Sequence, residues 1–82
     1  MRYEIEFVPT ALAQLRGLPK DVRRLIGAKL DRAQQDFSGD IKKLKGFKNK
    51  YRLRAGSYRV LFELEGSCLV VYDVGDRKEI YD

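Results

Sequence analysis

The sequence predicts a small single α+β domain, residues 1–82, with the element order β-α-α-β-β-β, in which an N-terminal helix hairpin packs on a mostly antiparallel, twisted sheet. A length of 82 residues allows one domain with a thin core. Apolar residues recur at helical spacing between residues 10 and 37, and the flanking regions show strand-like patterns. The apolar and charged fractions, 44% and 35%, are those of a folded chain.

The first segment alternates charged and apolar side chains, which is typical of a strand with one side in water. We therefore expect a strand from Arg2 to Val8. Pro9 and Thr10 then suit the start of a helix, and the short apolar stripe that follows ends near Gly17.

A second, longer helix is predicted to follow Pro19, because apolar residues recur at helical spacing as far as Phe37 with charged residues opposite. Its apolar positions are Val22, Leu25, Ile26, Leu30, Ala33 and Phe37. The two helices should form a hairpin whose apolar residues belong to the core, and neither helix contains a cofactor-binding pattern.

The rest of the chain is predicted to contain a lysine-rich loop that ends at Asn49, followed by three strands joined by tight turns. The strands are expected at Lys50 to Arg54, Tyr58 to Leu64 and Cys68 to Val74. The last of them is apolar on both faces, so it should lie inside the sheet.

Positive charge is concentrated between Lys42 and Arg59. The net charge is +5, yet this segment holds eight basic residues and no Asp or Glu, so the rest of the chain, with nine Lys and Arg against 12 Asp and Glu, carries −3. The eight are Lys42, Lys43, Lys45, Lys48, Lys50, Arg52, Arg54 and Arg59. Short basic runs are often only solvated surface. Segregation of this degree predicts instead that the segment binds a polyanion, and RNA is the ligand that we favour.

The first hairpin of this region is expected to bring arginines together. If residues 55–58 form its loop, Arg54 pairs with Arg59 and Arg52 lies on the same face. Like charges directly opposite one another cost a few tenths to about 1 kcal/mol. An anion between the strands would remove that repulsion, since guanidinium groups match phosphate oxygens in two-point contacts. The alternative is three splayed, solvated arginines on an exposed face.

Several kinds of site are excluded by residue type. With no His, one Cys and no clustered carboxylates, the sequence offers neither a zinc site nor a Ser-His or Cys-His pair, and it has no phosphate-binding glycine loop. Cys68, in an apolar run, is expected to be an inert buried thiol. No cofactor and no metal is expected. The sequence shows neither a signal-peptide pattern nor a membrane-length apolar run, so we expect a soluble protein in a reducing cytoplasm.

RNA cleavage is compatible with these exclusions, because the 2′-OH of RNA can itself attack the adjacent phosphorus. Such a site needs in-line positioning, cations for the charge on the phosphorane, a proton acceptor for the 2′-OH and a donor for the departing 5′-oxygen. Arginines supply the cations but are poor acceptors. The candidate acceptors are Tyr58, Tyr81 and a lysine whose pKa is lowered by cationic neighbours.

Four short motifs add a family resemblance. They are Lys43-Leu44-Lys45-Gly46, Tyr51-Arg52-Leu53-Arg54, Gly56-Ser57-Tyr58-Arg59-Val60 and Val74-Gly75-Asp76-Arg77-Lys78-Glu79-Ile80-Tyr81. In this order and spacing, and over nearly the whole chain, the sequence resembles the RelE branch of the RelE/ParE toxin superfamily. The resemblance implies a bacterial or archaeal toxin, an mRNA interferase that enters the ribosomal A site, cleaves mRNA there and inhibits translation.

The resemblance also implies roles for individual residues. Arg59 would hold the scissile phosphate, Arg77 would stabilise charge or protonate the leaving group, and Tyr81 would orient or stack on the substrate. Arg52 and Arg54 fall where well-known members of the family carry lysines, one of them proposed as the base, so the acceptor stays open between Tyr81 and Lys50. The loop lysines and a neighbouring tyrosine are expected to contact RNA; they are Lys42, Lys43, Lys45, Lys48, Lys50 and Tyr58.

The partners implied are a cognate antitoxin, the ribosome through 16S rRNA at its A site, and mRNA, with no membrane. The toxin–antitoxin complex is expected to bind its own operator DNA through the antitoxin. Two alternatives from other classes remain. One is a ParE-like toxin that inhibits DNA gyrase by binding, since one fold serves both activities. The other is a non-catalytic module that binds RNA or the ribosome.

Overall fold

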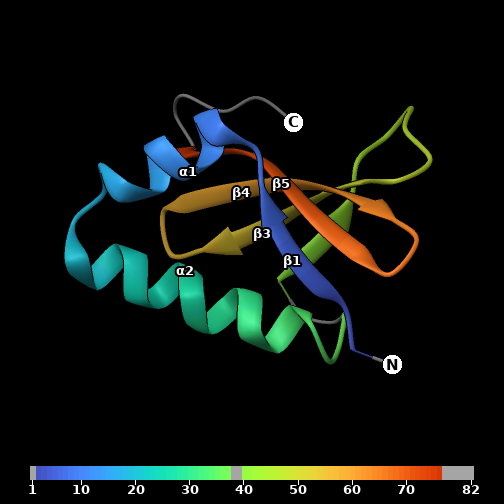
Figure 1. Cartoon of the computed structure of the whole chain (residues 1–82), viewed down its shortest axis with the longest axis horizontal. Helices are drawn as coiled ribbons and strands as arrows, with labels where there is room; N and C mark the ends of the chain where they lie inside the picture. The colour runs from blue at the N-terminus through green and yellow to red at the C-terminus, as the bar shows by residue number, and fades with distance from the viewer. Residues whose placement is uncertain (1, 38–39, 77–82) are drawn as a thin grey trace.

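The computed structural model describes residues 2–37 and 40–76, and it shows an α+β domain with the helix hairpin on one side of a single sheet (Figure 1). The described part contains two helices and five strands. In chain order they are β1 (Glu4–Phe7), α1 (Pro9–Arg16), α2 (Lys20–Ala33), β2 (Ile41–Lys43), β3 (Lys50–Ala55), β4 (Tyr58–Glu65) and β5 (Cys68–Asp76).

The strand order in the sheet is β1-β5-β4-β3-β2. β1 runs parallel to β5, and every other neighbouring pair is antiparallel. This arrangement confirms the predicted mostly antiparallel sheet. It also confirms the predicted place of β5, which lies between β1 and β4 and is therefore shielded on both edges, as its apolar sequence requires.

The core lies between the helices and one face of the sheet. Phe62 of β4 is fully buried at its centre, where the ring of Tyr51 stacks on it with centroids 5.5 Å apart and Phe37 meets it edge-on at 5.6 Å. α1 is tied to β5 by Gln14, whose side-chain oxygen accepts from the Val74 N–H at 2.9 Å. Among the described residues, neither helix is long and apolar enough to cross a membrane.

One additional strand and an earlier end of α2 are the main differences from the expectation, whereas the four predicted strands keep their places with ends shifted by one or two residues. The stretch from residue 40 to 49 was expected to be a loop, but Ile41–Lys43 form the edge strand β2 beside β3, giving one strand more than predicted. Three residues with two lysines are too short and too polar to show a strand pattern, and tertiary pairing with β3 decides. α2 ends at Ala33 rather than near Phe37, although Phe37 still reaches the core from the segment after the helix.

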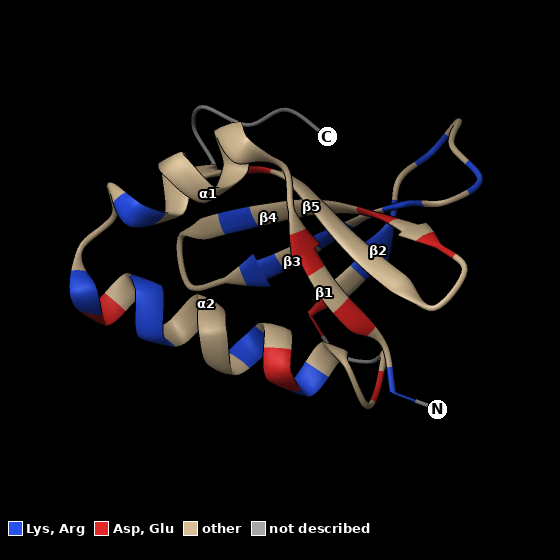
Figure 2. Ribbon diagram, in the orientation of Figure 1, with Lys and Arg blue, Asp and Glu red and all other residues tan. Residues whose placement is uncertain are grey.

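Charged residues divide along the sheet, with Asp and Glu on β1 and the end of β4, and Lys and Arg on β2, β3 and the start of β4 (Figure 2). Because side chains alternate between the two faces of a strand, this division falls on the face away from the helices, which we call the open face. Its acidic end lies on β1 and at the far end of β4, with Glu4, Glu6, Glu63 and Glu65 in adjacent cross-strand rows. Its basic end lies on β2, β3 and the start of β4, with Lys42, Lys50, Arg52, Arg54 and Arg59. Between these ends, Leu44, Leu61 and Tyr72 form a small apolar cluster of their own.

Candidate nucleic-acid interface

The candidate site is built on the β3–β4 hairpin. Gly56 and Ser57 form its two-residue turn, and Gly56 has φ 62°, a left-handed conformation that glycine adopts without strain. The register is the predicted one: Arg54 lies opposite Arg59. Because side chains alternate between the two faces of a strand, both point to the open face, as does Arg52.

The three guanidinium groups are close enough to affect one another. The pKa of the Arg52 guanidinium is lowered, first by its partial burial and then by the positive charges of Arg59 and Arg54. Arg52 and Arg59 are half-buried while Arg54 is exposed, so solvent screens the cluster only in part. A multivalent anion placed among these side chains would gain from every one of them.

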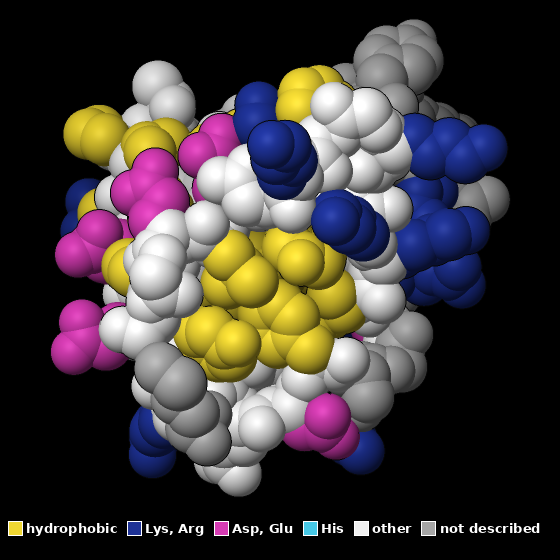
Figure 3. All heavy atoms as spheres, turned by 90° about the vertical axis from the view of Figure 1, so that its right-hand side faces the viewer, with side chains coloured by type: hydrophobic (Ala, Val, Ile, Leu, Met, Phe, Trp, Pro, Cys, Tyr) yellow, Lys and Arg dark blue, Asp and Glu magenta, His cyan; other side chains and the backbone are white. Residues whose placement is uncertain are grey.

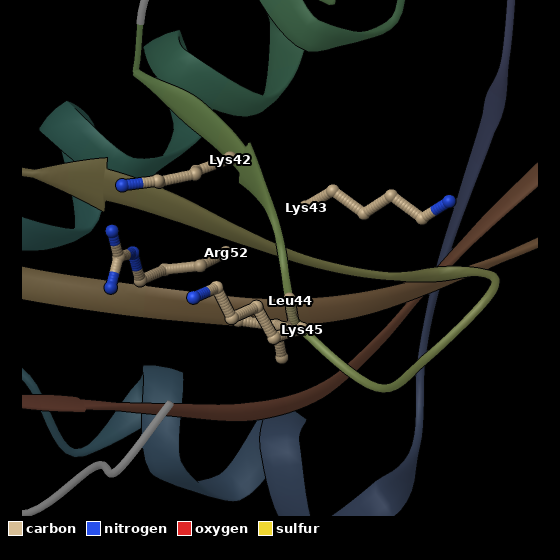
Figure 4. A pocket seen from close by; sticks show the side chains of 5 residues that line it. All are labelled: Lys42, Lys43, Leu44, Lys45 and Arg52. Carbon is tan, nitrogen blue, oxygen red and sulfur yellow. The ribbon is translucent and has the colours of Figure 1, made fainter.

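β2 adds further cations to this cluster. Lys42 lies directly opposite Arg52 in the register of β2 and β3. A pocket of about 260 Å³ is lined by Asp40, Ile41, Lys42, Arg52 and Arg54, and a neighbouring one of about 230 Å³ by Lys42, Lys43, Leu44, Lys45 and Arg52. Lys42, Lys45 and Arg52 point to the same side of the pocket, whereas Lys43 points away (Figure 4). Figure 3 shows Lys and Arg side chains gathered on one side of the molecule, beside an apolar area.

One carboxylate borders this cationic surface. Asp40 precedes β2 and forms an ion pair with Lys29 of α2. The pKa of Asp40 is lowered, chiefly by the hydrogen bond and charge of Lys29, with smaller contributions from Arg54 and Arg32. Asp40 therefore offsets part of the positive charge of Arg54. The sequence of the basic segment did not predict this interaction.

Lys50 occupies a different environment from the arginines, although it points to the same face. Its ammonium lies 3.5 Å from the Glu63 carboxylate, 4.6 Å from the centre of the Phe47 ring and 5.3 Å from that of Tyr72. The contacts described for Lys50 are thus a carboxylate and two aromatic rings rather than the cationic neighbours that the base hypothesis assumed.

Two further residues that were predicted to contact RNA, Lys48 and Tyr58, lie apart from the arginines. Lys48 is exposed in the loop before β3. Tyr58 lies on the helix-facing side of the sheet, where it packs against the core, because it pairs with Ala55 one position before Arg59. It therefore does not join the arginines on the open face. Arg77 and Tyr81 lie outside the described residues.

The described ranges, 2–37 and 40–76, contain no candidate metal site, since no three His, Cys, Asp or Glu side chains are grouped there so as to hold a metal ion. Cys68 is half-buried rather than buried. The pKa of its thiol is raised, first by desolvation and then by hydrogen bonding and charge from Glu6, which favours the unreactive protonated form.

Comparison with known proteins agrees with the fold and with the motifs. Residues 5–81 match the family model described as ParE toxin of type II toxin-antitoxin system, parDE. The chain is 34% identical to Toxin RelE3 of Methanocaldococcus jannaschii over 84 residues, covering 96% of each protein.

Solved structures give the same result. The chain superposes with a TM-score of 0.77 and 34% identity on a protein chain of the RelB–RelE antitoxin–toxin complex from Methanococcus jannaschii, over 94% of this chain and 95% of that one. It matches the isolated E. coli RelE toxin with a TM-score of 0.78 and 26% identity, covering 90% and 83% of the two chains. The fold also matches the archaeal RelE–RelB complex of Pyrococcus horikoshii at a TM-score of 0.80 and 23% identity, over 98% and 100%. The protein therefore belongs to the RelE/ParE superfamily, as a RelE-family toxin of a type II toxin–antitoxin system.

Proposed function

We propose that this toxin is a metal-independent endoribonuclease that cleaves mRNA in the ribosomal A site and thereby inhibits translation. The observation that carries the proposal is the grouping of Arg52, Arg54 and Arg59 on one face of the hairpin, with Lys42 beside them. A fold maintained for stability alone would avoid a like-charged pair directly across a ladder. A phosphate group between the strands gives that arrangement a use.

The reaction is a transesterification within the RNA. The 2′-oxygen bonds to the adjacent phosphorus, the bond from phosphorus to the 5′-oxygen breaks, and the products end in a 2′,3′-cyclic phosphate and a 5′-hydroxyl. Arg59 holds the scissile phosphate, and Arg52 and Arg54 stabilise the extra negative charge of the phosphorane. Arg77 stabilises charge or protonates the 5′-oxygen, and Tyr81 orients the substrate.

The proton acceptor for the 2′-OH is proposed to be Tyr81 or Lys50. Lys50 is on the open face, two positions before Arg52. Its ion pair with Glu63 has to loosen before its nitrogen could accept a proton. Replacing Lys50 with glutamine removes its amine and leaves Tyr81 in place, so this variant separates the two candidates.

We propose an acidic antitoxin as the partner that neutralises this face. In the solved complexes from Methanococcus jannaschii and from E. coli, relatives of this chain are bound to RelB. An antitoxin that covers Arg52, Arg54 and Arg59 has to supply carboxylates, because unpaired charges buried in an interface weaken it. The resulting complex would bind operator DNA through the antitoxin. In the free toxin, Lys42 of β2 and the lysines of the loop that follows, such as Lys45, would contact 16S rRNA.

A second candidate function is inhibition of DNA gyrase by binding, without catalysis. The observation that favours it is the match of residues 5–81 to a family model described as a ParE toxin. Superfamily membership cannot distinguish the two, since one fold carries both activities. A third candidate is a module that binds RNA or the ribosome without cutting it.

One experiment separates these functions. The protein is induced in cells, RNA ends are mapped and plasmid supercoiling is measured. Cuts within ribosome-bound codons support the proposed nuclease, whereas intact mRNA with impaired supercoiling supports gyrase inhibition. Intact mRNA with normal supercoiling leaves the binding module.

Variants test the site within the nuclease reading. Arg59→Ala and Arg77→Ala should fold normally and lose cleavage about a hundredfold or more, the range seen when one group that stabilises transition-state charge is removed. Arg24→Ala, on the exposed side of α2, is the matched control and should cleave as the parent does. Normal cleavage by both active-site variants would contradict the assignment.

A further inference from the structure

The loop between β2 and β3, which we call the tip loop (residues 44–49), carries an aromatic side chain in water. Phe47 is 47% exposed, and Leu25 on α2, at 39%, is the other large apolar residue exposed in the part of the chain that the structure describes. The flanking residues Lys45 and Lys48 are exposed too. The loop projects past the neighbouring strands at one corner of the domain (Figure 1).

The base of the tip loop is held by the sheet. The Leu44 N–H donates to the Lys50 carbonyl at 2.9 Å, and the Leu64 N–H donates to the Asn49 carbonyl at 2.9 Å. The Asn49 side chain returns a bond to the Leu64 carbonyl at 3.3 Å. Gly46 turns the chain with φ 82°, a value that other residues rarely adopt. Phe47 therefore lies in a turn whose two ends are held by hydrogen bonds to the sheet.

A cation contacts the Phe47 ring. The Lys50 ammonium lies over the ring, 4.6 Å from its centre, and is itself held by Glu63 at 3.5 Å and by the face of Tyr72 at 5.3 Å. A cation over the face of an aromatic ring is attracted to it and favours that ring orientation. The 47% exposure of Phe47 leaves part of the side chain accessible to a ligand.

We propose that Phe47 stacks on an unpaired RNA base while Lys45 and Lys48 hold the adjoining phosphates, and that Lys50 is the positioning residue for the ring. The inference rests on the proposed function, because it names a second RNA contact outside the arginine cluster. An aromatic ring beside basic side chains is the combination with which proteins bind single-stranded RNA, since every base can stack on a ring and every phosphate carries a negative charge. Isolated exposed apolar residues are common, but this one is aromatic, anchored and surrounded by lysines.

The competing occupant is an apolar pocket on a protein partner. A protein pocket accepts any apolar side chain of suitable size, whereas stacking requires a ring. Substituting leucine for the aromatic residue therefore separates the two, with no need to identify the partner beforehand.

The test measures binding of the full-length protein to two fluorescent probes of equal charge, a single-stranded RNA decamer and an abasic ribose-phosphate decamer. Phe47→Ala should weaken RNA binding about tenfold and leave abasic binding unchanged. Phe47→Trp should retain affinity and Phe47→Leu should not. Lys48→Gln should weaken both probes and reduce the slope of log K against log salt by about 0.7, whereas Phe47→Ala should leave the slope as it is.

Two substitutions test the role of Lys50. Lys50→Gln should lower the affinity for the RNA probe more than the affinity for the abasic probe. Lys50→Arg keeps a cation over the ring and should return the affinity for the RNA probe to that of the parent. Leu25→Ala is the matched control for loss of an exposed apolar side chain and should bind both probes normally. Unchanged melting temperatures establish that the variants fold.

Each contrary result has a distinct meaning. If the parent binds the RNA probe but Phe47→Ala binds it equally well, or if Phe47→Leu restores binding, stacking is wrong and the proposed nuclease function stands. Equal losses on both probes also overturn stacking, because the ring then acts without a base. If the parent binds neither probe, this inference is overturned, whereas the proposed nuclease function is decided separately by mapping cuts in ribosome-bound mRNA.

Discussion

Replacing Arg54 with glutamine should make the free protein more stable and should weaken its binding of anions. Arg54 lies directly across the ladder from Arg59, and its charge also reaches Arg52. Like charges opposite one another in a sheet cost a few tenths to about 1 kcal/mol. Arg54 is exposed and is partly offset by Asp40, so we expect a gain near the middle of that range, about 0.5 kcal/mol.

The gain is measurable for a domain of this size. About 1 kcal/mol shifts the melting temperature of a domain of 60 to 100 residues by roughly 4–8 °C, so Arg54→Gln should melt about 2–4 °C higher. Urea is the suitable denaturant because it adds no ionic strength. The difference should be largest near 0.01 M salt, where the screening length is about 30 Å, and should disappear near 1 M, where it is about 3 Å.

Anion binding should reverse the order. At constant ionic strength, sulfate should stabilise the parent more than Arg54→Gln, because a ligand stabilises the state that binds it more tightly. Arg24→Gln removes the same charge from the exposed side of α2 and controls for net charge. If Arg54→Gln is no more stable than the parent at low salt, or if Arg24→Gln shows the same gain, the arginines are not repelling one another and the reasoning is wrong.

Three further predictions concern the core, the acceptor and the thiol. Phe62→Ala should lose about 3–5 kcal/mol, because Phe62 is fully buried against two other rings; urea unfolding measures this, and a loss below about 1 kcal/mol would contradict the packing described. If Lys50 accepts the proton, Lys50→Gln should slow cleavage and remove the corresponding limb of the pH–rate profile; a slower reaction with an unchanged profile would assign acceptance elsewhere and leave Lys50 a positioning role. Cys68 should react with iodoacetamide more slowly than a cysteine peptide at pH 8, because its raised pKa reduces the thiolate, and Glu6→Gln should speed the reaction. Mass spectrometry follows the alkylation, and a rate equal to that of the peptide would count against the raised pKa.

The hairpin register could be predicted from sequence because two independent signals agree on it. A two-residue loop at Gly56-Ser57 and the alternation of apolar and charged side chains require the same pairing, and a slip by one residue would turn Leu53 and Val60 toward water. Leu61 is apolar although the alternation turns it to the open face, and there it packs in the small cluster with Leu44 and Tyr72.

The same alternation could have corrected the assignment of Tyr58. The register that turns Arg59 outward necessarily turns its neighbour inward, so Tyr58 faces the core. Strand β2 and the ion pair of Asp40 with Lys29 could not be predicted in this way. Both depend on tertiary packing, because the sequence of β2 has no strand pattern of its own and the strand forms by lying beside β3 and α2.

The roles that we propose for Phe47 and Lys50 also lay beyond a sequence argument. An exposed aromatic residue in a loop has no periodicity to identify it, and a cation over its ring depends on the three-dimensional closure of the tip loop. The basic character of residues 42–59 predicts a polyanionic ligand. It does not distinguish the side chains that we propose to hold phosphate from the one that we propose to orient a ring.

The division of the open face into an acidic and a basic end gives the domain an electric dipole in the plane of its sheet (Figure 2). A net charge of +5 spread evenly would attract a polyanion in every orientation. In the binding that we propose, separated charge would also exert a torque, which would turn the arginine end toward the polyanion and the glutamate end away from it. Since screening in the cell limits such forces to roughly 8 Å, this rotation belongs to the last step before contact. The glutamates of β1 and β4 would thus help to set the orientation in which the protein meets its ligand.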